Sequence, residues 1–272
     1  MHCRKRLEQC GVTLIELIIV ITITGIIAVA VAVFISRPVE GYIDAARRAE
    51  LTDIADTALR RMTRDLRTAL PNSIRITESP PASGVLYLEF LQTSGGGRYR
   101  SEPDSGGGGD FLDFAAPDAT FDVIGAMPAF AGGESIVIYN LGASGAVANA
   151  YAGDNRAAYA ANAGGAITLA AAKQFPFPSP GRRFQVVQYA VTYLCNPATG
   201  ELRRYWNYGI PAAQPTPPAT PNNALLATNV TACGFVYAAA GTRTGAVALS
   251  LRVERDGEPI QLFQQVHVNN AP

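Results

Sequence analysis

The sequence predicts an α+β fold, in which a long N-terminal hydrophobic α-helix packs on a mostly antiparallel β-sheet domain with long loops. Three observations support this prediction: nineteen residues without a charge from Leu17 to Ile35, a helical apolar pattern over 51–70, and alternating apolar patterns beyond it. The 272 residues are few enough for one domain with its own core behind the helix.

The uncharged stretch is long enough to cross a membrane. As an α-helix it would extend about 28 Å, close to the thickness of the hydrocarbon core of a bilayer. No second stretch of this kind follows in the sequence, so we expect one span. The formal net charge is 0, with Arg4, Lys5 and Arg6 against Glu8 at the start, and this gives no electrostatic reason to expect a nucleic acid partner.

Residues 37–71 are predicted to continue the helix with one apolar and one charged face. Apolar residues recur at spacings of three and four, and Pro71 is expected to end the helix. Pro38 and Gly41 predict a bend or a local break within it. The apolar face comprises Leu51, Ile54, Ala55, Ala58, Leu59, Met62, Leu66, Ala69 and Leu70. The residues expected on a solvated face are Asp53, Asp56, Arg60, Arg61, Arg64, Asp65 and Arg67.

The rest of the chain, residues 72–272, is predicted to be β-rich. The second of two expected hairpins turns at Arg255-Asp256-Gly257-Glu258, and the first turns at an Asn-Pro-Ala-Thr-Gly sequence. The expected strands and hairpins lie at 73–77, 85–92, 134–140, 183–210 and 245–270. The Gly/Ala-rich stretches 94–110 and 142–172 and the Pro-rich stretch 211–222 are expected to be long surface loops.

The positions of the four cysteines indicate the kind of cellular compartment in which the domain folds. Cys3 and Cys10 precede the uncharged stretch, whereas Cys195 and Cys233 lie far beyond it, so the second pair is expected to share a fold. A disulfide between them would close a loop of 38 residues and stabilise the fold by about 4 kcal/mol, which indicates an oxidising space. Two unpaired buried thiols are the alternative.

The start of the chain does not fit an ordinary secretory signal. The apolar core is too long, and no small-x-small cleavage site follows it. Instead, the sequence Gly11-Val12-Thr13-Leu14-Ile15-Glu16-Leu17, after a short basic leader, closely resembles the processing site of type IV pilins and type II secretion pseudopilins. The resemblance implies that a prepilin peptidase cuts between Gly11 and Val12 and that the new amine of Val12 is methylated. Val12 stands where that family usually has Phe.

This resemblance divides the chain into four segments. Residues 1–11 are the leader peptide, 12–36 the transmembrane and filament-core helix, 37–71 the amphipathic second half of the helix, and 72–272 the periplasmic or extracellular β-rich domain. The protein is then expected to lie in the inner membrane as a single-pass protein with a periplasmic C-terminal domain, and later in a pilus or pseudopilus.

Glu16 would be the fifth residue of the mature chain. A carboxylate among apolar helices is costly unless it meets a cation. The resemblance implies that this cation is the N-terminal amine of a neighbouring subunit, so that Glu16 sets the register of assembly. Two alternatives are a pair with its own Val12 amine and an interaction with the positive end of its own helix dipole.

The resemblance also implies partners and a role. The partners are prepilin peptidase, other major and minor pilin subunits, an inner-membrane assembly platform and inner-membrane lipid. The segment after the span is similar to minor pilin-like subunits of the MSHA pilus biogenesis proteins of the MshO type, and the size and hairpins resemble the larger J-type pseudopilin of type II secretion. A pilin-delivered adhesin or ligand-binding module is the alternative from another class.

Signals for catalysis are weak. His267 is the sole histidine after the leader and is expected to be an ordinary strand residue, so we predict no enzyme, no catalytic residue and no cofactor. Glu102, Asp104 and Asp110 surround four glycines, a composition that could bind Ca²⁺. Their spacing matches no EF-hand loop, so a flexible turn is the favoured interpretation and no metal site is predicted.

Overall fold

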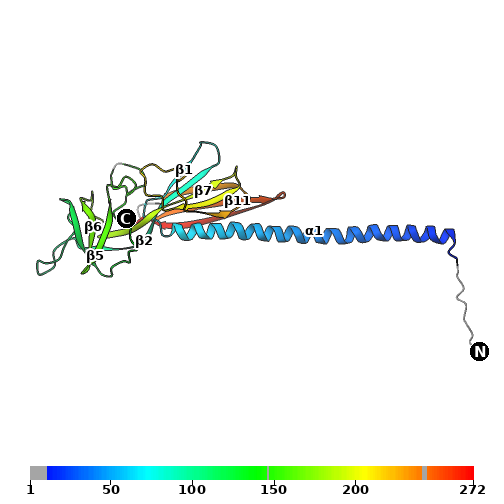
Figure 1. Ribbon diagram of the computed structural model, residues 1–272, viewed down its shortest axis with the longest axis horizontal. Helices are drawn as coiled ribbons and strands as arrows, with labels where there is room; N and C mark the ends of the chain where they lie inside the picture. The colour runs from blue at the N-terminus through cyan, green and yellow to red at the C-terminus, as the bar shows by residue number, and fades with distance from the viewer. Residues whose placement is uncertain (1–10, 146, 241–243) are drawn as a thin grey trace, which may run out of the picture. The chain divides into compact units, whose positions relative to one another are not determined.

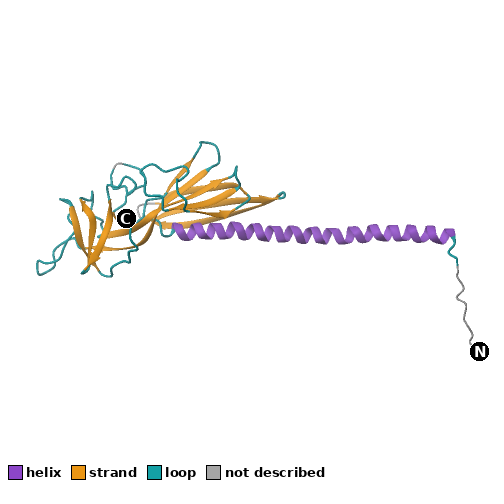
Figure 2. Ribbon diagram, viewed as in Figure 1, coloured by secondary structure: helices purple, strands orange, loops and turns teal. Residues whose placement is uncertain are grey.

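A computed structural model describes residues 11–145, 147–240 and 244–272. The leader residues 1–10, with Cys3 and Cys10, therefore lie outside the described residues. The described chain forms one long helix, α1 (Leu14–Leu66), followed by twelve strands (Figures 1 and 2), which confirms the predicted α+β class. The chain divides into two compact units, Met1–Glu50 and Leu51–Pro272.

Twelve strands follow α1 in the described chain. They are β1 (Arg75–Glu78), β2 (Leu86–Tyr99), β3 (Asp118–Ile124), β4 (Ser135–Ile138), β5 (Arg156–Ala163), β6 (Ala166–Lys173), β7 (Arg183–Asn196), β8 (Glu201–Trp206), β9 (Asn223–Ala227), β10 (Val230–Ala240), β11 (Thr244–Arg255) and β12 (Glu258–Asn269).

In the first unit, α1 exposes its apolar side chains. The stretch Leu14–Phe34 is 21 residues long, none of it is buried, and it is long and apolar enough to cross a membrane. The hydroxyl of Thr22 donates to the carbonyl oxygens of Ile18 (3.0 Å) and Ile19 (2.9 Å), so this polar group is satisfied inside the helix. The helix is uninterrupted between its ends, so the local break allowed at Pro38 and Gly41 is absent, and a bend there stays a prediction.

In the second unit, the apolar face of α1 is buried as predicted. Leu51, Leu59 and Leu66 are at most 2 % exposed, and only Ile54 and Ala69 of the predicted face are half-buried. The helix ends at Leu66 and not at Leu70, because the following backbone joins the sheet. There the amide of Leu70 donates to the carbonyl of Leu91 on β2 at 2.7 Å.

Two antiparallel sheets form the β-rich part. Nine strands follow the order β1-β2-β3-β6-β5-β4-β7-β8-β9, and a separate sheet has the order β10-β11-β12. Both predicted hairpins are present, as β7–β8 and β11–β12, and the second turns at Asp256-Gly257 with positive φ values of 53° and 81°. The stretch 211–222 has no strand, as expected for the Pro-rich loop.

Six strands close on themselves. Each neighbour in the series β2-β3-β6-β5-β4-β7 pairs antiparallel with the next, and β7 pairs again with β2. All six strands contribute buried residues to one core. In this core the ring of Phe121 packs edge to face with the rings of Tyr99 and Phe184. We call these strands the β-ring; it lies at the end of the domain labelled β5 and β6 in Figure 1.

The β-ring corrects part of the prediction that 94–110 and 142–172 are loops, because, apart from the turn 164–165, only 100–110 and the described residues of 142–155 have no strand. Residues 94–99 belong to β2, where a Cβ on Gly97 would lie 2.7 Å from Cζ of Phe184, so a glycine lets this core ring approach the strand. Residues 156–173 form the hairpin β5–β6, whose turn Gly164-Gly165 has φ values of 59° and 90°. The glycines therefore mark a close approach and a tight turn within the sheet.

A second core lies between α1 and the two sheets. It combines the buried face of α1 with residues of β2, β7 and β11. The structure has a disulfide between Cys195 on β7 and Cys233 on β10, with 6.4 Å between the Cα atoms. This bond therefore connects the nine-stranded sheet to the three-stranded sheet.

The solvated face predicted for α1 is wrong at Asp65. Asp65 is 5 % exposed, and its Oδ2 accepts hydrogen bonds from Nε of Arg204 (2.7 Å) and the hydroxyl of Tyr193 (2.8 Å). Burial alone would lower the pKa of Arg204, but the interactions with Asp65 and Tyr193 together outweigh it and raise that pKa. Position 65 follows the charged pattern of the helix, but β7 and β8 cover it. Two other residues of that face, Asp56 and Arg60, form an exposed ion pair.

Candidate processing and assembly site

The predicted cleavage site lies just before α1. Gly11, Val12 and Thr13 have no regular secondary structure, all three are exposed, and the helix begins at Leu14. A protease must bind its substrate in a non-helical conformation, which these residues already have. The Gly11–Val12 bond is therefore accessible without unwinding any of the helix.

The local sequence fixes where the helix begins. Thr13 is the N-cap residue, and its side-chain oxygen accepts a hydrogen bond from the backbone amide of Glu16 at 3.3 Å. Thr13 and Glu16 have the spacing of a capping box, in which a hydroxyl residue is followed three positions later by Glu. The acidic residue also lies in the first turn, where the helix dipole favours a negative charge.

The carboxylate of Glu16 stands on an apolar surface. Leu14, Ile15 and Leu17 around it are 78 %, 67 % and 53 % exposed. The side chain of Glu16 makes no ion pair with any residue in the described ranges. The helix dipole therefore acts on this carboxylate within the chain, and its capacity for a cation is unused.

Cleavage after Gly11 would create an amine at Val12, close to this carboxylate. The new amine would be four residues before Glu16, which is about one helical turn. The arrangement can therefore support a pair within one chain or a pair between two chains. Both of the interpretations drawn from the sequence remain chemically available.

The other residues singled out from the sequence do not converge on a site. His267 lies on β12 with an exposed side chain, opposite Ala246 on β11. Asp104 accepts hydrogen bonds from the backbone amides of Gly106 (2.9 Å) and Gly108 (2.8 Å), and these bonds lower its pKa. Glu102 instead pairs with Arg182. Among the described residues, no three or more His, Cys, Asp or Glu side chains gather as a metal site.

Comparison with known proteins agrees with the motif at the start of the chain. The family described as the prokaryotic N-terminal methylation motif matches residues 6–32, which include the Gly11–Val12 bond and Glu16. No curated protein and no solved structure matches the chain. This motif and the apolar helix that follows it support a type IV pilin-like protein that is processed by prepilin peptidase.

Proposed function

We propose that this protein is a minor type IV pilin-like subunit of the MSHA pilus biogenesis type. It is cut between Gly11 and Val12, enters a pilus or its initiation complex through α1, and presents its β-rich domain outward. The domain lies in the periplasm before assembly, and the role is structural and not enzymatic. The observation that carries this proposal is the methylation motif over 6–32 followed by an apolar helix with exposed side chains.

The exposed helix supports assembly through physical chemistry. A stretch of 21 residues that buries none of its apolar surface within the chain is stable in lipid or against other apolar helices, but not in water. In the membrane, Glu16 lies near the interface, where a charge costs less than at the centre. Among packed helices the same carboxylate needs a cation, and the amine of an adjoining subunit provides it.

Replacement of Glu16 by Ala tests this proposal. We expect mass spectrometry to find a methylated Val12 at the start of both the Glu16→Ala and wild-type chains, because the cleavage bond is unchanged. Cross-linking to other pilin subunits, measured in cells that assemble the filament, should fall by about tenfold in the variant, since one buried ion pair is lost.

Asp53→Ala is the matched control. Asp53 is exposed on the same helix, outside the apolar stretch, so its removal should leave processing and cross-linking unchanged. Unaltered incorporation of Glu16→Ala would refute the register role. A wild-type chain that still begins at Met1, or that is cut beyond Ile35, would refute the proposal as a whole.

The J-type pseudopilin of type II secretion is the second candidate. Its support is the size of the β-rich domain and the two C-terminal hairpins, β7–β8 and β11–β12. The same cross-linking experiment distinguishes the two, because the partners recovered are either pilus subunits or secretion subunits.

A further inference from the structure

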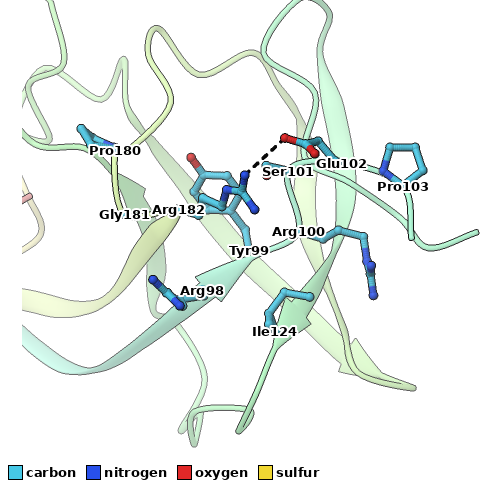
Figure 3. Close-up of a pocket in the computed structure, with 10 residues that line it drawn as sticks. All are labelled: Arg98, Tyr99, Arg100, Ser101, Glu102, Pro103, Ile124, Pro180, Gly181 and Arg182. Carbon is cyan, nitrogen blue, oxygen red and sulfur yellow. Dashed lines mark hydrogen bonds and ion pairs between the residues drawn. The ribbon is translucent and has the colours of Figure 1, made fainter. Parts of the chain in front are cut away.

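A basic pocket lies at the rim of the β-ring. It has a volume of about 390 Å³ and is formed where β2 and β3 end and where the chain enters β7. Figure 3 shows Arg98, Arg100 and Arg182 around it, with Glu102 and Ile124. The mouths of β-barrels are frequent ligand sites, and this volume is in the range of small-ligand pockets. We call it the Arg98 pocket.

The arginines of the pocket differ in how they are neutralised. Arg100 is 3.0 Å from the carboxylate of Asp122, and both side chains are about one-quarter exposed. Arg182 is 3.2 Å from Glu102, whose side chain is 75 % exposed (dashed line in Figure 3). Arg98 is exposed, and within the described ranges its guanidinium makes no ion pair or side-chain hydrogen bond. The pocket therefore has unused capacity for a negative charge.

A fourth arginine adds to this excess. Arg183 pairs directly with Arg98 across the β2–β7 ladder, so the two side chains leave the same face of the sheet. A Cβ on Gly181, which lines the pocket, would lie 3.1 Å from Nε of Arg183, so this side chain covers the wall of the pocket. Like charges opposite each other destabilise a sheet, and a bound anion would relieve this repulsion.

The remaining walls indicate the shape of the ligand. Ile124, which is 45 % exposed, Pro103 and Pro180 also line the pocket, and they give it small apolar surfaces on separate sides (Figure 3). The hydroxyl of Ser101 is buried and has no hydrogen-bond partner among the described residues, and rotation about χ1 would make it available to a ligand. A sugar acid offers a carboxylate, hydroxyls and an apolar ring face, which matches these three kinds of surface.

We propose that the Arg98 pocket binds the carboxylate of an acidic sugar, with Arg98 and Arg182 as its ligands. Arginine presents a planar fork that matches a carboxylate. Glu102 already places a carboxylate on Arg182, and because that pair is exposed, a ligand can displace it. This inference does not depend on how the helix assembles, since the pocket lies wholly within the unit Leu51–Pro272.

Calorimetric titration of the full-length chain with trigalacturonate tests the proposal. The protein is kept in a non-ionic polyoxyethylene detergent, which offers neither sugar nor anion. We expect saturable binding of trigalacturonate and none of neutral maltotriose. Arg98→Gln should lower the association constant by about tenfold or more, and Arg98→Lys, which keeps the charge but loses the fork, should lower it less. Glu102→Gln should raise it, because the internal competitor is removed.

Arg203→Gln is the matched control. Arg203 is paired with Glu201 on β8, away from the pocket, and its loss should leave the association constant unchanged. Circular dichroism of every variant verifies that the fold is intact. The proposal is overturned if the wild-type chain does not bind trigalacturonate, if Arg98→Gln binds as well as Arg203→Gln, or if inorganic phosphate binds more tightly than trigalacturonate.

Discussion

The two parts of α1 use apolar residues in opposite ways. Up to Phe34 the helix is apolar on all sides and exposes residues such as Ile23, which is 52 % exposed. From Leu51 onward it is apolar on one side, and that side is buried in a core formed with strands. The apolar side of the segment from Leu51 onward is buried by strands of the same chain, whereas the segment up to Phe34 requires lipid or other subunits to bury its apolar surface. The period of the pattern therefore tells which part of the helix contributes to folding and which part is left for assembly.

The largest expected effect concerns a charge that the second part buries. Asp65→Asn removes the negative partner of Arg204, which is 7 % exposed at its side chain. The remaining favourable neighbours of Arg204, which include Gln92 (3.1 Å) and the ring of Trp206, are uncharged. We expect a loss of about 3–5 kcal/mol in the free energy of unfolding, because a buried cation is left unpaired. Urea unfolding, followed by fluorescence of the single tryptophan, measures it.

Asp56→Asn provides the comparison on the same helix. Asp56 is 41 % exposed at its side chain and pairs with Arg60, which is 74 % exposed. An exposed pair of this kind contributes about 0.3–0.5 kcal/mol. Equal losses for the two variants would contradict the view that β7 and β8 convert one charged position of α1 into a core position.

The next effect compares apolar residues in the two parts of the helix. Leu59→Ala deletes a side chain that is 2 % exposed within the core under the helix, and should lower the free energy of unfolding by about 2–5 kcal/mol. Ile23→Ala changes an exposed residue and should alter it by less than about 0.5 kcal/mol. Urea unfolding of both full-length variants in detergent measures the difference. A large loss for Ile23→Ala would show that the first part contributes to the fold of the domain.

The sequence was sufficient where one local pattern decides the structure. The helix, its buried face and the hairpin at Asp256-Gly257 each follow from periodicity or turn chemistry within a short segment. The β5–β6 hairpin was missed although Gly164-Gly165 is a recognised turn signal, because its strands are mostly alanine and contain only two β-branched residues, Ile167 and Thr168.

The closed β-ring and the Arg98 pocket could not be predicted in the same way. Both depend on pairings between distant strands, such as Arg98 with Arg183, and no local pattern encodes such a pairing. Asp65 was misplaced for the same reason, since its partners Tyr193 and Arg204 come from β7 and β8. The candidate site at Gly11, Val12 and Glu16 differs because all its residues lie within six positions of each other.

The smallest expected effect concerns the buried carboxylate of Glu89. Glu89 is 0 % exposed; burial raises its pKa above the ordinary 4.5, although Arg75, 2.5 Å away, acts in the opposite direction. The folded chain then binds this proton more tightly than the unfolded chain. The contribution of Glu89 to stability is therefore largest at low pH and is lost as the pH rises above 4.5 through the raised pKa.

Glu89→Gln removes this pH dependence and keeps most of the hydrogen bonds. Arg75 retains the carbonyl oxygens of Pro211 (3.1 Å) and Ala212 (2.6 Å), so its charge stays solvated by the protein. We expect the variant and the wild type to have similar free energies of unfolding near pH 4. At neutral pH the variant should have the higher free energy of unfolding, by about 1.4 kcal/mol for each tenfold by which folding raises the proton affinity of Glu89. Urea unfolding at several pH values measures this difference. A difference that is constant or reversed with pH would mean that Arg75 fully offsets the burial of Glu89, and that a buried carboxylate in this domain is as favourable as an exposed one.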